Sequence, residues 1–270
     1  VTFYINTLLP VGPALAGRIM GKRVVYHYHE NAFVKGTFYK VLATIMQKLA
    51  HKIICVSEYQ ASFLQQKKCV ITVPNALPQN FVNRLTPNFQ AAFKRKHILM
   101  LGSLKLYKSP LEFIELTKRL PQFIFVLVIN DTKENINIFI KEYKINISKN
   151  LTIYPQQNDV VPFYNQTSLV LNLSNKKQFV ETFGLTALEA MSAGLPVIVP
   201  TEGGIAEMVV DGENGYKIDV QNLNQIAECI KTILSDETLY MELAQNALAY
   251  SKRFSEAKMV NSIEMILNRK

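Results

Sequence analysis

Short apolar runs alternate with segments of helical periodicity along this chain of 270 residues. The runs of strand length are residues 1–7, 23–29, 52–56, 69–73, 97–102, 123–129, 151–155, 168–174 and 195–200. Most are continuously apolar, which is typical of parallel strands buried on both faces. Because helical patterns fall between the strands, the alternation predicts an α/β fold built on parallel sheets.

Helix signals fill the intervals between these runs. Ser57 with Gln60 three residues later forms a capping-box pattern, and Pro110 stands where a helix can begin. Apolar residues at three- and four-residue spacing predict helices, which we place at about 38–49, 134–143, 160–164, 184–193, 220–234, 237–252 and 256–268.

The alternation of strands and helices is interrupted once, over residues 77–96, which contain two prolines and show no clear period. We interpret this stretch as the region of an interdomain linker. The sequence then divides into an N-terminal domain at 1–88, a C-terminal domain at 89–254, and a final helix at 255–270 that we expect to pack back toward the N-terminal domain.

Charge separates the two domains. Residues 1–88 hold ten basic and two acidic residues, a net charge of +8, whereas the rest holds 20 basic and 19 acidic residues, a net charge of +1. This asymmetry favours a polyanionic partner, either an anionic membrane surface or a phosphorylated lipid. No nucleic-acid-binding motif accompanies the charge, so we predict no nucleic-acid partner. A solvated basic face is the alternative.

Other classes of protein are disfavoured. No apolar run approaches the ~18 residues that a membrane span needs, and no signal-peptide pattern opens the chain. Cys55, Cys69 and Cys229 lack metal-ligand spacing and are expected to be idle thiols in a reducing compartment. We predict no metal site and no cofactor.

The segment 181–200 carries the strongest candidate chemistry. Glu181 falls in the predicted loop between a strand ending near Ser174 and a helix starting near Gly184, at the strand end where open α/β sheets bind ligands. The free amides of a helix's first turn favour an anion, and glycine lets the backbone approach it. Glu189 falls among apolar positions of the same helix and needs a polar partner.

A carboxylate, a set of amides and a second carboxylate match the sugar hydroxyls, diphosphate and ribose of a nucleotide sugar. The alternative is purely structural: Glu181 caps the helix and Glu189 pairs with a lysine. The sequence ETFGLTALEAMSAGLPVIVPTEGGIAEMVVDGENGYKI at 181–218 resembles the E-x7-E region of retaining glycosyltransferases of family 4, which have the GT-B fold of two Rossmann-like domains. Shorter stretches resemble the same family in the right order: VVYHYHE, VSEYQ, VPNALP and LMLGSLKLYKSP.

The resemblance implies roles for named residues. Glu181 would bind hydroxyls of the transferred sugar and Glu189 the ribose, while the backbone amides of Phe183, Gly184 and Leu185 would face the phosphates.

The resemblance also implies that Lys108 neutralises the leaving diphosphate, in a family whose members are metal-independent. Ser103 stands where the family usually has arginine, and Lys105 is expected to substitute for it.

His29 matches the family histidine that faces the donor sugar. His27 points to the same side of its strand by parity, so the exchange of the two stays open.

The resemblance has a gap at the start of the chain. Family members open with a glycine-rich loop and more strands than the four predicted here, so we expect an incomplete N-terminal domain, either as a fragment of a longer enzyme or as a unit completed by a partner.

We predict a hexosyltransferase-type glycosyltransferase (EC 2.4) that transfers a sugar with retention from a UDP- or GDP-linked donor. Its acceptor would be a glycan or a polyprenyl-phosphate-linked lipid, in cell-surface polysaccharide biosynthesis such as lipopolysaccharide or capsule. It would lie in the cytoplasm, peripheral to the inner face of the membrane. The alternative is a truncated, catalytically silent nucleotide-sugar-binding subunit. A sugar-nucleotide epimerase or phosphorylase is a third interpretation, which the E-x7-E spacing disfavours.

Overall fold

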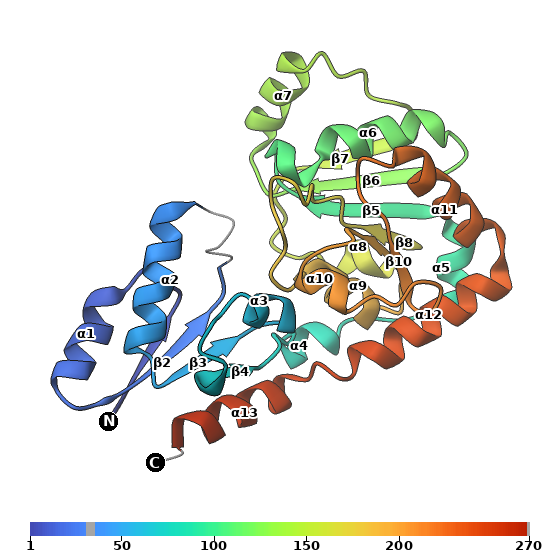
Figure 1. Cartoon of the computed structure of the whole chain (residues 1–270). Coiled ribbons are helices and arrows are strands. Elements are labelled where there is room, and N and C mark those ends of the chain that lie inside the picture. The colour runs from blue at the N-terminus through green and yellow to red at the C-terminus, as the bar shows by residue number, and fades with distance from the viewer. Residues whose placement is uncertain (31–35, 269–270) are drawn as a thin grey trace.

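The computed structural model describes residues 1–30 and 36–268, which form two parallel-sheet domains (Figure 1). The N-terminal sheet has four strands in the order β1-β2-β3-β4. Its elements are β1 (Thr2–Asn6), α1 (Val11–Ile19), β2 (Arg23–Tyr28), α2 (Thr37–Leu49), β3 (Lys52–Cys55), α3 (Glu58–Ser62), a 3₁₀ turn (Lys67–Cys69) and β4 (Val70–Thr72).

Helices cover both faces of the N-terminal sheet. The amphipathic α2 turns Leu42 and Met46 toward the sheet, where they share a buried core with Tyr26 and with α1. The opposite face packs against α13 (Glu256–Asn268), whose Ile266 lies in a second core with Val25. The helix α13, far along the chain, therefore packs on the first domain.

The C-terminal domain is larger. Its elements are β5 (His97–Gly102), a 3₁₀ turn (Leu106–Lys108), α6 (Pro110–Arg119), β6 (Ile124–Ile129), α7 (Lys133–Glu142), β7 (Leu151–Tyr154), α8 (Val161–Asn165), β8 (Leu169–Leu171), α9 (Leu185–Ser192), β9 (Val197–Val199), α10 (Gly204–Glu207), β10 (Gly215–Lys217), α11 (Leu223–Ser235) and α12 (Glu237–Ser251). Its buried core is the largest in the described part of the chain.

The strand order of the second sheet fixes where a ligand can bind. The order is β10-β9-β8-β5-β6-β7, all parallel, so the chain runs outward in opposite directions from the β5–β8 pair. Loops leaving the carboxyl ends of these two strands diverge to opposite sides and open a crevice between them. The sequence-predicted strands 97–102 and 168–174 thus flank the switch point of the sheet.

The connection between the domains contains two helices that the sequence pattern did not reveal, α4 (Gln79–Val82) and α5 (Phe89–Arg95). Asn88 caps α5 by accepting a hydrogen bond from the amide of Ala91 at 3.0 Å, and α5 packs on α12. The second half of the expected linker is therefore part of the C-terminal domain.

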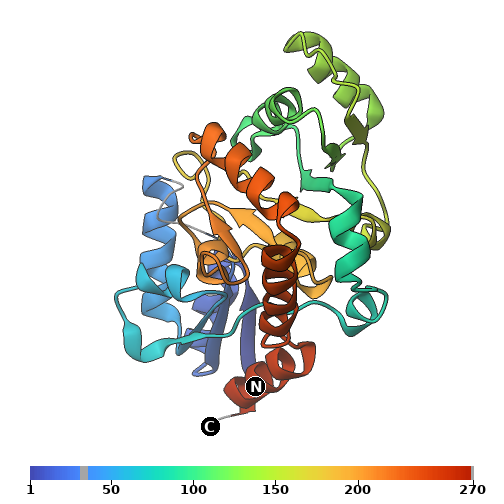
Figure 2. The same ribbon diagram turned by 90° about the vertical axis from the view of Figure 1, so that its right-hand side faces the viewer.

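The chain crosses between the domains a second time. Figures 1 and 2 show α12 leaving the C-terminal domain and α13 lying along the N-terminal one, so both chain ends lie at the first domain. Two connections restrain the domain orientation more than one linker would. No helix within residues 1–30 and 36–268 has the length and apolarity needed to cross a bilayer.

Candidate active site

A cavity of about 550 Å³ lies between the two domains at the switch point of the second sheet. The N-terminal domain contributes His29, at the end of β2, and Asn75, after β4. The C-terminal domain contributes the loops that follow β5, β6 and β8 and the start of α9. The lining residues from that domain are Met100, Leu101, Gly102, Ser103, Lys108, Asn130, Asn172, Leu173, Ser174, Glu181, Thr182, Phe183, Gly184, Leu185 and Thr186.

The amino terminus of α9 forms one wall of the cavity. Gly184 is its N-cap residue and adopts φ +94°, a left-handed conformation that favours glycine. A Cβ atom at this position would stand 2.4 Å from Cγ1 of the buried Ile205. The helix therefore begins directly at the cavity, and its first-turn amides have no intrahelical acceptor. Such a terminus favours a bound anion.

Two more glycines hold the loop that precedes α9. A Cβ on Gly204 would stand 1.9 Å from the carbonyl oxygen of Thr182, and one on Gly203 would stand 2.5 Å from that of Glu181. The Gly204 amide donates to the Glu181 carbonyl at 2.8 Å. Backbone packs directly on backbone here, which explains the adjacent glycines in the sequence and makes the loop rigid.

The Glu181 side chain enters the cavity and forms an ion pair with Lys108. The Ser174 hydroxyl also donates to the Glu181 carboxylate, at 3.1 Å. Lys108 lies over the ring of Phe179, with Nζ 4.2 Å from its centroid. Both charged side chains are mostly buried, with exposures of 23% for Lys108 and 17% for Glu181. The ion pair is therefore part of the cavity wall and not a surface contact. The two residues predicted to bind sugar and diphosphate bind each other here.

His29 lines the cavity, whereas His27 lies behind it. The two rings are 4.1 Å apart between centroids, and the Tyr4 hydroxyl lies 2.5 Å from Nδ1 of the buried His27. Nε2 of His27 has no hydrogen-bond partner among the described residues. Burial, with a smaller contribution from His29, lowers the pKa of His27 to about 4. Burial also lowers the pKa of His29, against the opposing effect of Glu30. Both imidazoles are therefore neutral at pH 7, and His29 is the one that can face a ligand.

The remaining predicted residues divide into two groups. Ser103 lines the cavity, but Lys105 is exposed and is not among the lining residues that the structure describes. Glu189 is likewise outside that set, one turn further along α9, where its carboxylate accepts a hydrogen bond from the buried Tyr164. Burial raises the pKa of Glu189, and the Tyr164 bond opposes that rise. The partner that the sequence required for Glu189 is thus present within the protein.

Sequence reasoning missed several polar residues of the cavity, namely Asn75, Asn130, Asn172, Ser174, Thr182 and Thr186. Asn130 and Asn172 directly follow β6 and β8, a position that could have marked them. Asn172 spans the site: its amide nitrogen donates to the Thr186 hydroxyl at 3.3 Å and its oxygen accepts from the Ser174 amide at 3.1 Å. The cavity is therefore lined by neutral hydrogen-bonding groups around one ion pair.

Within residues 1–30 and 36–268 no three His, Cys, Asp or Glu side chains gather as metal ligands would. The groups present that can stabilise an anion are the α9 amides, Lys108 and the neutral hydrogen-bond donors of the cavity.

Comparisons with known proteins agree with this geometry. A crystal structure of Anabaena HepE in complex with UDP and glucose superposes with a TM-score of 0.82 at 20% identity, covering all of this chain and 78% of that one. An uncharacterized glycosyltransferase of Haemophilus influenzae is 23% identical over 257 residues, 91% of this chain and 69% of the relative. The N-acetyl-alpha-D-glucosaminyl L-malate synthase of Bacillus anthracis is 30% identical over 142 residues, which is 52% of this chain but only 36% of that enzyme.

Two parallel-sheet domains with a cavity between them, at the switch point of the second sheet, define the GT-B class of glycosyltransferase folds. The profile of the family described as glycosyl transferases group 1 matches residues 84–250, well over half of the chain. The chain belongs to this family.

Proposed function

We propose that the protein transfers a sugar from a nucleotide-sugar donor, with retention, and that the donor binds in the interdomain cavity. The observation that carries this proposal is the start of α9: a helix terminus opened by Gly184 faces the cavity, with Glu181 and Lys108 beside it. That terminus suits the diphosphate, and Glu181 suits the hydroxyls of the sugar.

The ion pair suggests how the donor enters. Before binding, Glu181 neutralises Lys108, so neither charge is buried without a partner. A nucleoside diphosphate sugar can replace each partner: its phosphates accept from Lys108, and its sugar hydroxyls donate to Glu181. The α9 amides and Lys108 then stabilise the charge that develops on the departing diphosphate.

A UDP-linked sugar is the first donor to test. HepE was crystallised with UDP and with UDP-glucose, and the structurally similar TarM was crystallised with UDP. Since these structures share 20% identity or less with this chain, they support a trial donor and not an assignment.

The acceptor is proposed to be a glycan or a polyprenyl-phosphate-linked lipid of cell-surface polysaccharide synthesis, reached at the inner, anionic face of the membrane. Residues 11–29 and 36–57 contain no Asp or Glu, and the exposed outer side of α2 carries Lys40 and Lys48 beside exposed Phe38 and Val41. Each lysine near an anionic surface contributes about 1 kcal/mol, an attraction that salt screens.

Two further lysines of the N-terminal domain are not counted in this surface. Lys35 lies outside the described residues, and Lys67 donates to the carbonyls of Ala61 and Ser62 at the end of α3. Liposome co-sedimentation with neutral and anionic lipids over a salt series tests the membrane proposal. Equal binding to neutral and anionic lipids would show that the positive charge does not drive membrane binding and serves only solubility.

A second candidate function is a catalytically silent nucleotide-sugar-binding subunit. Ser103 in the cavity favours it, because a neutral hydroxyl cannot neutralise a leaving diphosphate as a cation would.

Calorimetric titration of the intact chain with UDP, GDP and ADP, with and without EDTA, tests the shared premise of both functions. We expect at least one nucleotide to bind, with the same affinity in EDTA. Binding to none, or binding abolished by EDTA, would contradict it. Release of UDP from UDP-glucose then separates an enzyme from a silent subunit.

A further inference from the structure

The glutamate at the end of α10 joins the two domains. The Glu207 carboxylate, from the C-terminal domain, accepts from the backbone amides of Glu58 and Tyr59 at the start of α3 in the N-terminal domain, at 3.1 Å for Glu58. Burial raises the pKa of Glu207, and these two bonds oppose the rise. One carboxylate thus satisfies two amides that the helix itself leaves without acceptors.

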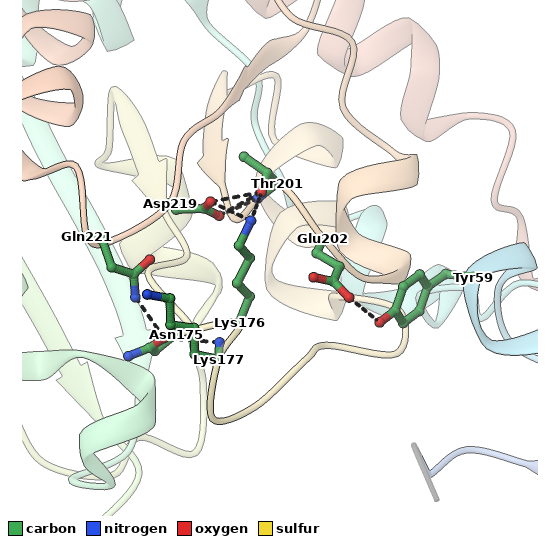
Figure 3. Close-up of polar contacts among 8 residues, drawn as sticks. All are labelled: Tyr59, Asn175, Lys176, Lys177, Thr201, Glu202, Asp219 and Gln221. Atoms are coloured by element: carbon green, nitrogen blue, oxygen red, sulfur yellow. Dashed lines mark hydrogen bonds and ion pairs between the residues drawn. The ribbon is translucent and has the colours of Figure 1, made fainter. Parts of the chain in front are cut away.

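A neighbouring contact supports this joint. The Tyr59 hydroxyl donates to Glu202 at 2.8 Å, which Figure 3 shows reaching toward α3 from the loop before α10. On its other side the same loop is anchored within the C-terminal domain: Figure 3 shows Thr201 bonded to Asp219, which also pairs with Lys176 at 2.6 Å. The segment 202–207, which includes α10, is therefore held from both sides. We call this segment the bracket.

The bracket holds the donor loop as well as α3. Gly204, at its centre, donates to the Glu181 carbonyl at 2.8 Å, and the position its Cβ would take lies 2.7 Å from the Ser57 hydroxyl oxygen, at the N-cap of α3. A shift of α3 relative to this bracket would therefore change the placement of the N-terminal domain against Glu181.

On the N-terminal side, α3 is tied to the residue that follows His29. Gln60 donates from its side-chain nitrogen to the Glu30 carbonyl at 2.9 Å. Its side-chain oxygen accepts from the Val56 amide at 3.0 Å, and not from the Ser57 amide as in a full capping box. The Gln60 side chain is buried, so both bonds are shielded from water.

Together these contacts form one path around the cavity. It runs from His29 and Glu30 through Gln60 to α3, from α3 through Glu207 to α10, and from Gly204 to Glu181. His29 and Glu181 line the same cavity from opposite domains, so the path sets how they face each other.

We propose that Glu207 is a positioning residue, which sets His29 opposite Glu181 through the hydrogen bonds it makes to α3. The proposal rests on the transferase function proposed above. The groups proposed to hold the diphosphate, Lys108 and the α9 amides, belong to the C-terminal domain, whereas the proposed reaction needs both sides of the cavity. Loss of Glu207 should therefore lower turnover and spare nucleotide affinity.

Three variants of the full chain test this role. Glu207→Gln keeps the size of the side chain but offers only one acceptor oxygen to the two amides, and Glu207→Ala removes both. Glu213→Gln is the matched control, because it makes the same change of charge at an exposed glutamate of the same domain. Thermal unfolding of each variant excludes misfolding, and Glu207→Gln serves if the alanine variant does not fold.

Three readouts are compared. UDP affinity is measured by calorimetry, and UDP release is measured at saturating UDP-glucose. The interdomain distance is measured by pulsed electron paramagnetic resonance between labels at exposed Thr44 on α2 and Asn137 on α7, in a Cys69→Ser, Cys229→Ser background. We expect both Glu207 variants to broaden the distance distribution and to lose at least tenfold in UDP release, with UDP affinity unchanged within threefold. The Glu213 control should match the wild type.

An unchanged distance distribution in both Glu207 variants would overturn the proposal, and so would UDP affinity that falls in parallel with UDP release. A wild-type chain that neither binds nor releases UDP contradicts the proposed function instead. The distance measurement then still decides whether Glu207 holds the domains.

Discussion

The two domains contribute to the cavity in opposite ways. The C-terminal domain supplies 15 of its 17 described lining residues, and the N-terminal domain supplies only His29 and Asn75. Charge is distributed the other way, with +8 on residues 1–88 and +1 on the remainder. The domain with little net charge thus holds the anion-binding terminus, and the strongly basic domain contributes one neutral imidazole and one amide.

This difference separates binding from alignment. In the C-terminal domain the groups that suit a donor are fixed by backbone contacts at Gly184, Gly203 and Gly204. In the N-terminal domain His29 is placed from a distance, through Gln60, α3 and Glu207. Changes at His29, or along the contacts that place it, should therefore lower turnover more than UDP affinity, and changes that displace the glycine-packed backbone of the C-terminal domain should lower UDP affinity or stability.

The largest expected effect is Gly204→Ala. Its Cβ would stand 1.9 Å from the Thr182 carbonyl oxygen, and backbone atoms on both sides must shift to admit it. We expect about 3 kcal/mol of destabilisation and loss of UDP binding. Gly12→Ala is the control: Gly12, like Gly204, lies in the first turn of a helix without a left-handed φ, but nothing lies within 4 Å of its added Cβ. Equal urea midpoints for the two variants would show that close packing does not fix the donor loop.

Glu181→Gln should lower turnover by about 100-fold, because it removes the group proposed to orient the sugar. UDP affinity should be retained or rise, since Lys108 loses its anionic partner and becomes available to the phosphates. Calorimetry and UDP release are measured in parallel, with the exposed Glu228→Gln as the control. Loss of UDP affinity at unchanged turnover would mean that Glu181 binds the nucleoside and not the sugar.

The buried His27 predicts a pH dependence of stability that belongs to the N-terminal domain. Its pKa falls from 6.5 to about 4 because burial disfavours the charged imidazolium. A depressed folded-state pKa gives stability that is present above pH 6.5 and lost as the pH falls toward 4, by about 3 kcal/mol. The His27→Gln variant should therefore lose less stability than the wild type as the pH falls from 7 to 4. Urea unfolding of both proteins at pH 7, 5.5 and 4 checks this, and parallel pH curves would contradict it.

The smallest expected effect is a gain in stability from Ser109→Gly. Ser109 precedes α6 at φ +57°, and its buried hydroxyl has no hydrogen-bond partner among the described residues. Glycine removes both costs, for a net gain of about 1 kcal/mol. Lys144→Gly, at φ +48° on the surface, relieves only the backbone and should gain less. Urea midpoints that rank the two variants the other way would contradict the account of Ser109.

Most of the fold could be predicted from the sequence, because the buried parallel strands and the longer helices leave clear apolar patterns. The exceptions are short or weakly apolar: α4 and α10 have four residues each, β10 has three, and α1 has an ambiguous pattern. The helix α5 was missed although Asn88 marks its start, because no regular apolar period follows it.

The site was predicted less evenly. Glycines and charged residues stand out in a sequence, so the 181–185 segment and Lys108 were found. Neutral residues such as Asn75, Asn130 and Asn172 carry no such signal, since asparagine is common in any turn. Pairings between distant residues were also invisible: Tyr164 with Glu189, and Glu207 with α3, join segments 25 and about 150 residues apart.

If the C-terminal domain binds the nucleotide and the N-terminal domain aligns the donor, His29→Ala should separate affinity from turnover. UDP-glucose affinity and the rate of UDP release are measured for the intact chain and the variant, with His51→Ala as a control outside the cavity. We expect His29→Ala to keep UDP-glucose affinity within threefold of the wild type and to lower UDP release by at least about 100-fold. Reduced affinity with unchanged turnover would place His29 in donor binding and contradict the division between the domains.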